Sequence, residues 1–259
     1  MKTKSGTYLS FRLSLLLIIV GLCVTANLFA GTKQQGAIQQ CADGNAATPS
    51  ACNTTGKLGY TSVNIGDRQS HYGEGDSLPV RILFNNLVVG QIYTVRIAYD
   101  FTTNGKYAVD YLTSVYRTES INNNPCVGVP GCVAASPSST APIPIDSQVA
   151  AGPDRQPFTG DDITQIPGDI TLFGGSGLVV AEDSFVGNLD ADSFQILSLS
   201  FTATVSNPVI AYGAHVAIQS DWGTGATASS VAGSRYQNSV VNFSGGSVGK
   251  SNVTMLLSQ

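Results

Sequence analysis

The stretch Ser77–Phe101, SLPVRILFNNLVVGQIYTVRIAYDF, contains the clearest strand patterns of the chain. Apolar side chains of its second half alternate with polar or small ones, which places five of them on one face of a strand: Tyr93, Val95, Ile97, Tyr99 and Phe101. Its first half alternates in the same way at Val80, Ile82 and Phe84. The segment 85–90 has the length of a hairpin connection and ends in glycine. We therefore predict two strands that pair antiparallel, with further strands covering their aromatic face.

The N-terminal 30 residues match a secretory signal peptide, which we expect to be removed. Basic residues precede a mostly apolar run, 13–24, and Ala26 and Ala30 offer cleavage points. A membrane-spanning helix needs about 20 apolar residues. A retained anchor is therefore the alternative, and we expect a secreted or cell-surface (extracellular) chain with no retained transmembrane helix. Cys23 would leave with the signal peptide.

Composition bounds the domain count and the partners. Residues 1–30 hold three of the 13 basic residues and none of the 17 acidic ones, so the mature chain carries a formal charge of −7. Phosphate binding requires a basic face, and we therefore expect no nucleic-acid partner. The remaining chain is long enough for one large sandwich or two small ones, and no linker divides it. We predict an all-β fold, an antiparallel β-sandwich (jelly-roll or Ig-like) with long disulfide-pinned loops, as a single domain over 58–259.

Four cysteines remain, and their spacing pairs Cys41 with Cys52 and Cys126 with Cys132. Closely spaced cysteines in even number indicate local disulfides in an exported protein. Zinc is the alternative, although neither pair is C-x-x-C and neither has a histidine beside it. Each bridge would pin a loop and stabilise the fold by about 3 kcal/mol on the chain-entropy model.

Three further segments carry structural predictions. Residues 31–57 are polar and small, which predicts an N-terminal surface arm tied down by its disulfide. The apolar spacing in 107–117 is closer to a helix than to a strand and predicts a short helix. The strand patterns 194–205 and 208–218 are joined by a Ser-Asn-Pro turn, which predicts that they are neighbours.

The segment 146–192 holds nine carboxylates against one base, Arg155. Calcium takes six to eight oxygen ligands, and 152–162 offers Asp154, Asp161 and Asp162 together with many turn carbonyls. Asp190 and Asp192 would add a second contribution. The order of acids that defines an EF-hand is absent. Bound Ca²⁺ is a hypothesis for this segment, and an acidic, solvated loop is the favoured alternative.

The sequence offers little support for catalysis. It contains two histidines, His71 and His215, and neither has a G-x-S-x-G motif beside it in the sequence. A Ser-His-Asp triad could assemble only in space, and His215 lies in the most apolar strand, where a core histidine is the common case. Paired carboxylates for glycoside hydrolysis are easy to imagine among 17 acids, which weakens the inference. We predict no enzymatic activity, and we take Tyr72, His215 and Trp222 as candidate ligand-binding residues.

Five blocks in order carry a resemblance: Tyr72–Arg81, Gly105–Ser114, Pro125–Cys132, Ala211–Ala217 and Asp221–Ala226. Together they resemble an uncharacterised secreted bacterial β-sandwich module that is found in surface proteins alongside adhesin-type β-sandwich repeats. The resemblance spans roughly 60–245 and implies a bacterial, exported, all-β surface or matrix protein. It transfers no catalytic residue. The chain departs from the module at Arg235-Tyr236 and carries no attached repeats.

These observations favour an exported structural or interaction protein at the cell surface or in an extracellular matrix. Its expected partners are other copies of itself or other surface proteins, bound by strand addition and, in one form, assembled into adhesive filaments. The alternative is a calcium-dependent carbohydrate-binding module, in which aromatic rings such as Trp222 stack on glycans.

Overall fold

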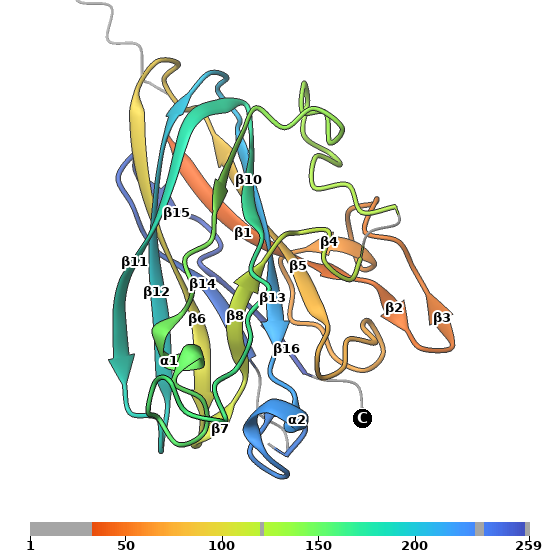
Figure 1. The fold of residues 1–259 in the computed structure, drawn as a ribbon. Coiled ribbons are helices and arrows are strands. Elements are labelled where there is room, and N and C mark those ends of the chain that lie inside the picture. Colours follow the sequence, from red (N-terminus) through yellow and green to blue (C-terminus); the bar gives the residue numbers. More distant parts are fainter. Residues whose placement is uncertain (1–32, 120–121, 231–235, 257–259) are drawn as a thin grey trace, which may run out of the picture. The chain divides into compact units, whose positions relative to one another are not determined.

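The computed structural model describes residues 33–119, 122–230 and 236–256, which belong to one unit, 32–259. The predicted signal peptide lies outside the described residues. Within them, strands form two main sheets (Figure 1). The first sheet runs in space as β15 (Ser247–Val248), β1 (Gln35–Ala42), β5 (Ser77–Asn85), β13 (Val209–Val216), β10 (Asp169–Phe173) and β9 (Ser139–Pro142), with β4 (Gly59–Thr61) beside β1 and β8 (Val109–Thr113) beside β13.

The second sheet runs as β11 (Gly175–Gly187), β12 (Ser193–Ala203), β6 (Ile92–Thr103), β14 (Tyr236–Phe243) and β16 (Asn252–Met255), with β7 (Lys106–Tyr107) beside β6. The small elements are the pair β2 (Gly44–Asn45) and β3 (Thr48–Pro49), the one-turn helices α1 (Ser147–Ala150) and α2 (Gln219–Trp222), and a 3₁₀ turn, Ala228–Ser230. Strands pair antiparallel, except that β1 meets β15 in parallel. The predicted all-β, antiparallel class is confirmed at this level.

One hydrophobic core takes side chains from both sheets. Phe84 of β5 packs against Phe201 of β12 and Phe243 of β14, with ring centroids 5.4 and 5.0 Å apart. Tyr93 of β6 contacts the same two rings at 6.0 and 5.7 Å. The aromatic face predicted for the opening stretch is therefore buried against the opposite sheet.

The predicted hairpin between the halves of Ser77–Phe101 is wrong, because β5 and β6 lie in different sheets. Both strand patterns are correct, and only the pairing differs. The connection crosses from one sheet to the other, and neighbouring backbone holds it: Leu87 N–H donates to the Ser206 carbonyl and Gly90 N–H to that of Ala203. A buried face with period two looks the same in a hairpin and in a crossing between sheets, so the sequence pattern does not separate them.

The same correction applies to β12 and β13, predicted as neighbours, which also lie in opposite sheets. A third crossing joins β10 to β11 through Gly174, whose carbonyl accepts from Thr204 N–H and Val205 N–H. Gly174 has φ +76°, and an added Cβ would lie 2.4 Å from Val205 Cγ2, so glycine is required there. The three crossings lie side by side at one end of the unit, the top of Figure 1.

The predicted surface arm over 31–57 is wrong for its first half. Residues 35–42 form β1, which pairs with β5 along six residues and buries Ile38 and Gln40 completely. The buried Gln40 amide donates to the Val63 and Thr254 carbonyls, at 3.1 and 2.7 Å. Polar residues are typical of an exposed arm, but this glutamine is buried with both donors of its amide nitrogen satisfied, while its Oε1 has no hydrogen-bond partner among the described residues.

The predicted helix over 107–117 is also wrong, because β7 and β8 occupy this stretch. Every residue of β8 is buried, Asp110 and Thr113 included. A strand that is buried on both faces need not alternate between polar and apolar residues, and here the apolar positions fall at a spacing close to that of a helix.

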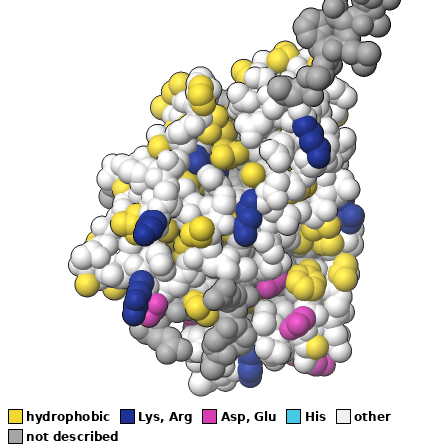
Figure 2. Space-filling view, turned by 180° about the vertical axis from the view of Figure 1, so that it is seen from behind, with side chains coloured by type: hydrophobic (Ala, Val, Ile, Leu, Met, Phe, Trp, Pro, Cys, Tyr) yellow, Lys and Arg dark blue, Asp and Glu magenta, His cyan; other side chains and the backbone are white. Residues whose placement is uncertain are grey.

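Both predicted disulfides are confirmed, Cys41–Cys52 and Cys126–Cys132. The second loop is fastened further by Arg81 of β5, which is 1% exposed. Its guanidinium donates to the Pro125 and Val127 carbonyls at 2.8 and 2.7 Å and lies 4.4 Å from the Tyr60 ring centroid. On the face shown in Figure 2, Lys and Arg side chains stand apart from one another, and one of them lies beside an acidic side chain.

Candidate functional site

Three side chains from separate parts of the chain meet beside the first disulfide: Asp43, His71 and Glu119, called here the Asp43 cluster. Each offers one ligand atom, and these atoms all lie within 4.8 Å of one another. Asp43 directly follows β1, His71 lies in the loop before β5, and Glu119 follows β8. In the described parts of the chain, this is the one group of three or more His, Cys, Asp or Glu side chains gathered so closely.

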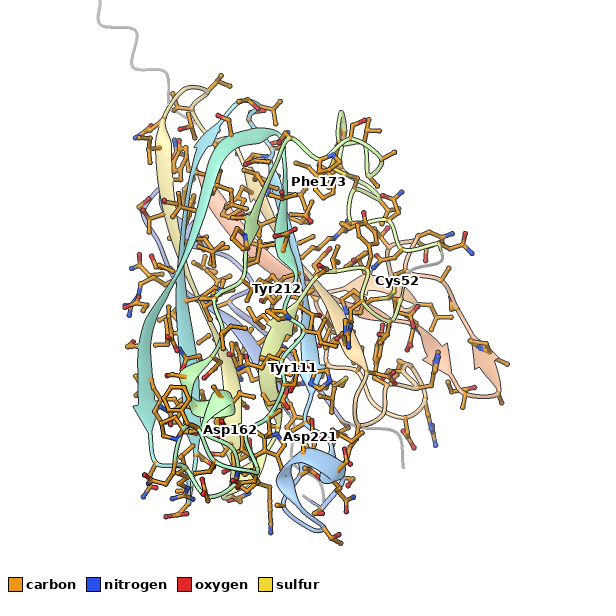
Figure 3. The ribbon with its side chains drawn as sticks, in the orientation of Figure 1. Cys52, Tyr111, Asp162, Phe173, Tyr212 and Asp221 are labelled. Carbon is orange, nitrogen blue, oxygen red and sulfur yellow. A yellow bond between two sulfur atoms is a disulfide. The ribbon has the colours of Figure 1, made fainter. Side chains whose placement is uncertain are left out.

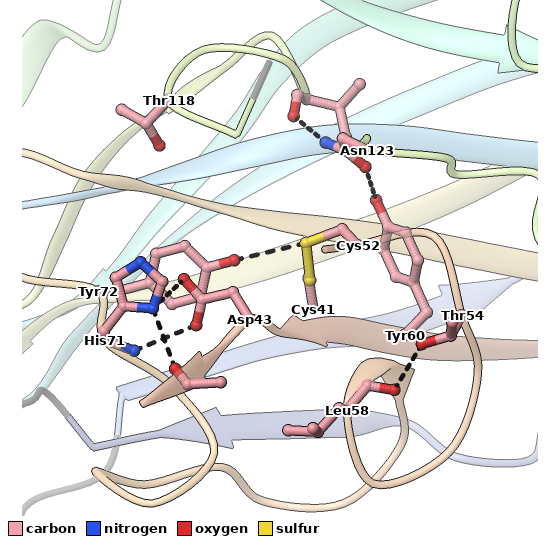
Figure 4. Close-up of a disulfide and its surroundings, with 12 residues drawn as sticks. Cys41, Asp43, Cys52, Thr54, Leu58, Tyr60, His71, Tyr72, Thr118 and Asn123 are labelled. Atoms are coloured by element: carbon pink, nitrogen blue, oxygen red, sulfur yellow. Dashed lines mark hydrogen bonds and ion pairs between the residues drawn. A yellow bond between two sulfur atoms is a disulfide. The ribbon is translucent and has the colours of Figure 1, made fainter. Parts of the chain in front are cut away.

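Local structure fixes Asp43 and His71 against each other (Figure 4). His71 N–H donates to Asp43 Oδ1 at 3.1 Å, and His71 Nδ1 lies 3.0 Å from the Gly44 carbonyl oxygen. Gly44 has φ +80°, and an added Cβ would lie 2.3 Å from the Thr48 carbonyl oxygen. The turn that presents the Gly44 carbonyl to the imidazole therefore requires glycine.

The second carboxylate oxygen of Asp43 lacks a donor. Asp43 Oδ2 lies 3.1 Å from His71 Nδ1, and the Asp43 side chain is 0% exposed. A neutral imidazole carries a single proton, and the Gly44 carbonyl accepts it on the Nδ1 side. Oδ2 is consequently a buried acceptor without a hydrogen-bond partner among the described residues.

Burial raises the pKa of Asp43 to about 7, with the His71 amide and imidazole acting in the opposite direction and the Glu119 charge adding to the rise. Burial also raises the pKa of Glu119, which the imidazole opposes and Asp76 reinforces. The His71 imidazole therefore does not offset the cost of burying these two carboxylates, and both keep a raised pKa.

Glu119 is positioned through the residue before it. The Thr118 hydroxyl donates to the Ser77 carbonyl and accepts from Ser77 N–H, both at 3.1 Å. This pair of bonds ties the end of the β8 segment to the start of β5, close to the loop that carries His71.

The predicted calcium ligands divide into separate groups. In the acidic loop, 152–162, Asp161 accepts from Asp154 N–H at 3.0 Å and from the Thr159 hydroxyl at 2.8 Å, while Asp162 accepts from Phe158 N–H at 2.9 Å. The Thr159 hydroxyl lowers the pKa of Asp161. These exposed carboxylates are satisfied by their own loop. Calcium at this loop stays a prediction.

Asp190 and Asp192 are engaged by other groups, and Asp190 is tied to the acidic loop through Arg155. Arg155 donates to Asp190 Oδ1 at 2.5 Å, and this contact lowers the pKa of Asp190. Asp192 Oδ1 accepts from Asn104 N–H at 2.8 Å, beside the turn after β6. Neither aspartate belongs to the Asp43 cluster.

The three candidate ligand-binding residues are all buried, so none of them offers an exposed ring for a ligand to stack on. Tyr72 is 1% exposed, Trp222 3% and His215 5%. Trp222 stacks on Tyr107, with ring centroids 3.6 Å apart. The Tyr72 hydroxyl lies 3.7 Å from Cys52 Sγ (Figure 4). Large aromatic rings bury more apolar area than other side chains, which accounts for the burial of Tyr72 and Trp222.

Asp110 is the partner of His215 that the sequence did not reveal. Its carboxylate lies 2.6 Å from His215 Nδ1 and accepts from Trp222 Nε1–H at 3.0 Å. Ser77 stands opposite His215 in the ladder of β5 and β13. However, the buried Ser77 hydroxyl has no hydrogen-bond partner among the described residues, so the serine–histidine contact of a triad is not made. The Asp110–His215 pair joins β8, β13 and α2.

No protein family, curated protein or solved structure matches the chain. Within the described residues, no helix is long and apolar enough to span a membrane.

Proposed function

We propose that this chain is an exported structural or interaction protein: a disulfide-pinned β-sandwich, jelly-roll or Ig-like, that joins other copies of itself at the cell surface or in an extracellular assembly. The N-terminal sequence pattern, the two disulfides and the two sheets around one core support this proposal.

The observation that carries the proposal is the edge of β11 after Leu178, since Gly175 N–H and Leu178 N–H already donate to the Ser138 and Ser139 hydroxyls. This strand has 13 residues and pairs with β12 on one side, and among the described residues no strand pairs with its other side. A bulge between Glu182 and Ser184 divides the edge into two regular stretches, 179–182 and 184–187. Val179 and Val186 are 58% and 49% exposed there. An edge strand with unpaired backbone groups is a template for pairing with another chain.

The partner is a second copy, paired through its own β11. The polar N-terminal segment is not free to add a strand to a neighbour, because it forms β1 inside the first sheet. Antiparallel pairing of identical edges gives a two-fold pair. Filaments would need one further contact between such pairs.

The test combines light scattering with negative-stain microscopy of the secreted protein. The wild type is expected to form pairs or longer assemblies. Val179→Lys with Val186→Lys places two charges on the edge and should give single particles. Val241→Lys is the matched control, since Val241 is 49% exposed on β14, a strand paired on both sides. A wild type that remains a uniform monomer at high concentration would contradict the proposal.

A second candidate, calcium-dependent carbohydrate binding, is favoured by one residue of the acidic loop. Phe158 is 96% exposed at φ +67°, a conformation in which its N–H donates to Asp162. With Ile145 and Pro157, its ring lines an open hollow of about 510 Å³. An exposed ring held on a carboxylate-capped loop is suited to stacking on a sugar face. A glycan array probed with wild type and Phe158→Ala, with calcium and with chelator, tests this candidate.

A further inference from the structure

We propose that Asp43, His71 and Glu119 bind one divalent transition-metal ion, of which Zn²⁺ is the representative. This site differs from the predicted calcium loop in place and in ligand chemistry, and it does not depend on assembly through β11.

The first support is the geometry of the ligand atoms. Two ligands that each lie about 2.0 to 2.1 Å from a tetrahedral zinc ion are about 3.3 Å apart. Asp43 Oδ2 and His71 Nδ1 are 3.1 Å apart, close to that separation. The Glu119 carboxylate completes a set whose members lie within 4.8 Å of one another, so a small adjustment of its partly exposed side chain closes the site.

The second support is independent of the clustering. Asp43 is 0% exposed, and its Oδ2 has no hydrogen-bond partner among the described residues while it is directed at the imidazole. A buried carboxylate oxygen without a donor costs free energy, because the group has lost its water and gained nothing in return. A cation between Oδ2 and Nδ1 supplies the missing partner. Its binding requires the imidazole proton to move from Nδ1 to Nε2, so that Nδ1 exchanges its contact with the Gly44 carbonyl for the metal.

The donor set selects the metal. Two carboxylates neutralise a divalent charge, and one imidazole nitrogen favours zinc and its neighbours over calcium or magnesium, which prefer oxygen alone. Three protein ligands leave a fourth position for water, as in open zinc sites.

The ion would cross-link three segments of the chain. It would join the end of β1, the loop before β5 and the segment after β8, next to the Cys41–Cys52 bridge. A ligand that binds only the folded chain stabilises it. We expect zinc at a hundredfold excess over Kd to raise the melting temperature by about 5 to 10 °C.

The experiment is zinc titration of metal-free mature protein, followed by calorimetry and by the ¹⁵N signals of the His71 imidazole. We expect one Zn²⁺ per chain and a shift of the His71 signals. His71→Gln and Glu119→Gln should each weaken zinc binding at least about tenfold. Both side chains are partly exposed, so these variants avoid the folding risk of replacing Asp43.

Asp67→Asn is the matched control, because Asp67 is an exposed carboxylate in the turn just before His71 and its loss changes the charge equally. It should bind zinc like the wild type. Calcium at the same concentration should leave the His71 signals in place. Absence of zinc binding, equal binding by Glu119→Gln and wild type, or displacement of zinc by an equal concentration of calcium would each overturn the proposal.

Discussion

Two groups of carboxylates, the Asp43 cluster and the acidic loop 152–162, differ in burial and in how their oxygens are hydrogen-bonded. Figure 3 shows Cys52, next to the Asp43 cluster, and Asp162 of the acidic loop well apart. The acidic loop is exposed, and its oxygens accept hydrogen bonds from its own backbone and Thr159. Asp43 is buried and keeps one oxygen without a donor. The proposed zinc site thus rests on a buried, unsatisfied oxygen beside a histidine, and not on the density of acids along the sequence.

Burial should have the same effect on a third carboxylate, Asp100 of β6, and should make the stability of the folded protein depend on pH. Burial raises its pKa to about 7, opposed by the bond from Gln237 N–H and reinforced by Asp192. The folded pKa lies above the unfolded value, so the stabilisation is fully present below about pH 4 and is lost as the pH rises through about 7.

Asp100 should therefore make the free energy of unfolding of the wild type larger at pH 4 than at pH 8 by on the order of 3 kcal/mol. Asp100→Asn, whose amide oxygen can still accept from Gln237 N–H, should lack this part of the dependence. Urea unfolding of both proteins across this range measures it. Parallel pH profiles would show that burial does not govern this carboxylate.

Direct substitution of one aspartate in each group sharpens the comparison. Asp43→Ala leaves the His71 amide without its acceptor in a buried place and should destabilise the metal-free protein by about 2 kcal/mol. Asp161→Ala, in the exposed loop, should cost less than about 1 kcal/mol. The two free energies of unfolding come from urea titrations in chelator. Equal costs would remove the distinction drawn here between the groups.

The smallest expected effect is that of calcium on the acidic loop. Millimolar calcium should raise the melting temperature of the wild type by a degree or two, which corresponds to weak binding, on the order of 0.5 kcal/mol. Asp161→Asn combined with Asp162→Asn should abolish the rise. Calorimetry with calcium and with chelator checks it, and identical wild-type curves would mean that the loop relies on its own hydrogen bonds.

The sequence predicted local properties better than partners. Alternation at Val80 to Phe84 and at Tyr93 to Phe101 located β5 and β6, and cysteine spacing located both disulfides. The alternation did not state which strand lies beside which, because a crossing between sheets and a hairpin share the same periodicity. Pairing is decided by long-range contacts, such as those of Leu87 with the segment before β13.

The site was harder to find for the same reason. Asp43 precedes Gly44-Asn45, which predicts an ordinary turn, and His71 and Glu119 follow 28 and 76 residues later. No spacing rule for metal ligands covers such distances. Asp110 was hidden likewise, since only the neighbouring strand brings His215 to it. The closeness of Asp43 to the Cys41–Cys52 bridge was the one local sign of a constrained environment.

The most direct test of the Asp43 cluster as a metal site is anomalous diffraction at the zinc absorption edge from crystals of the mature protein grown with zinc. We expect a peak about 2.0 to 2.2 Å from Asp43 Oδ2 and within bonding distance of His71 and Glu119. A map with zinc bound elsewhere, or with no peak between Asp43 and His71, would contradict it.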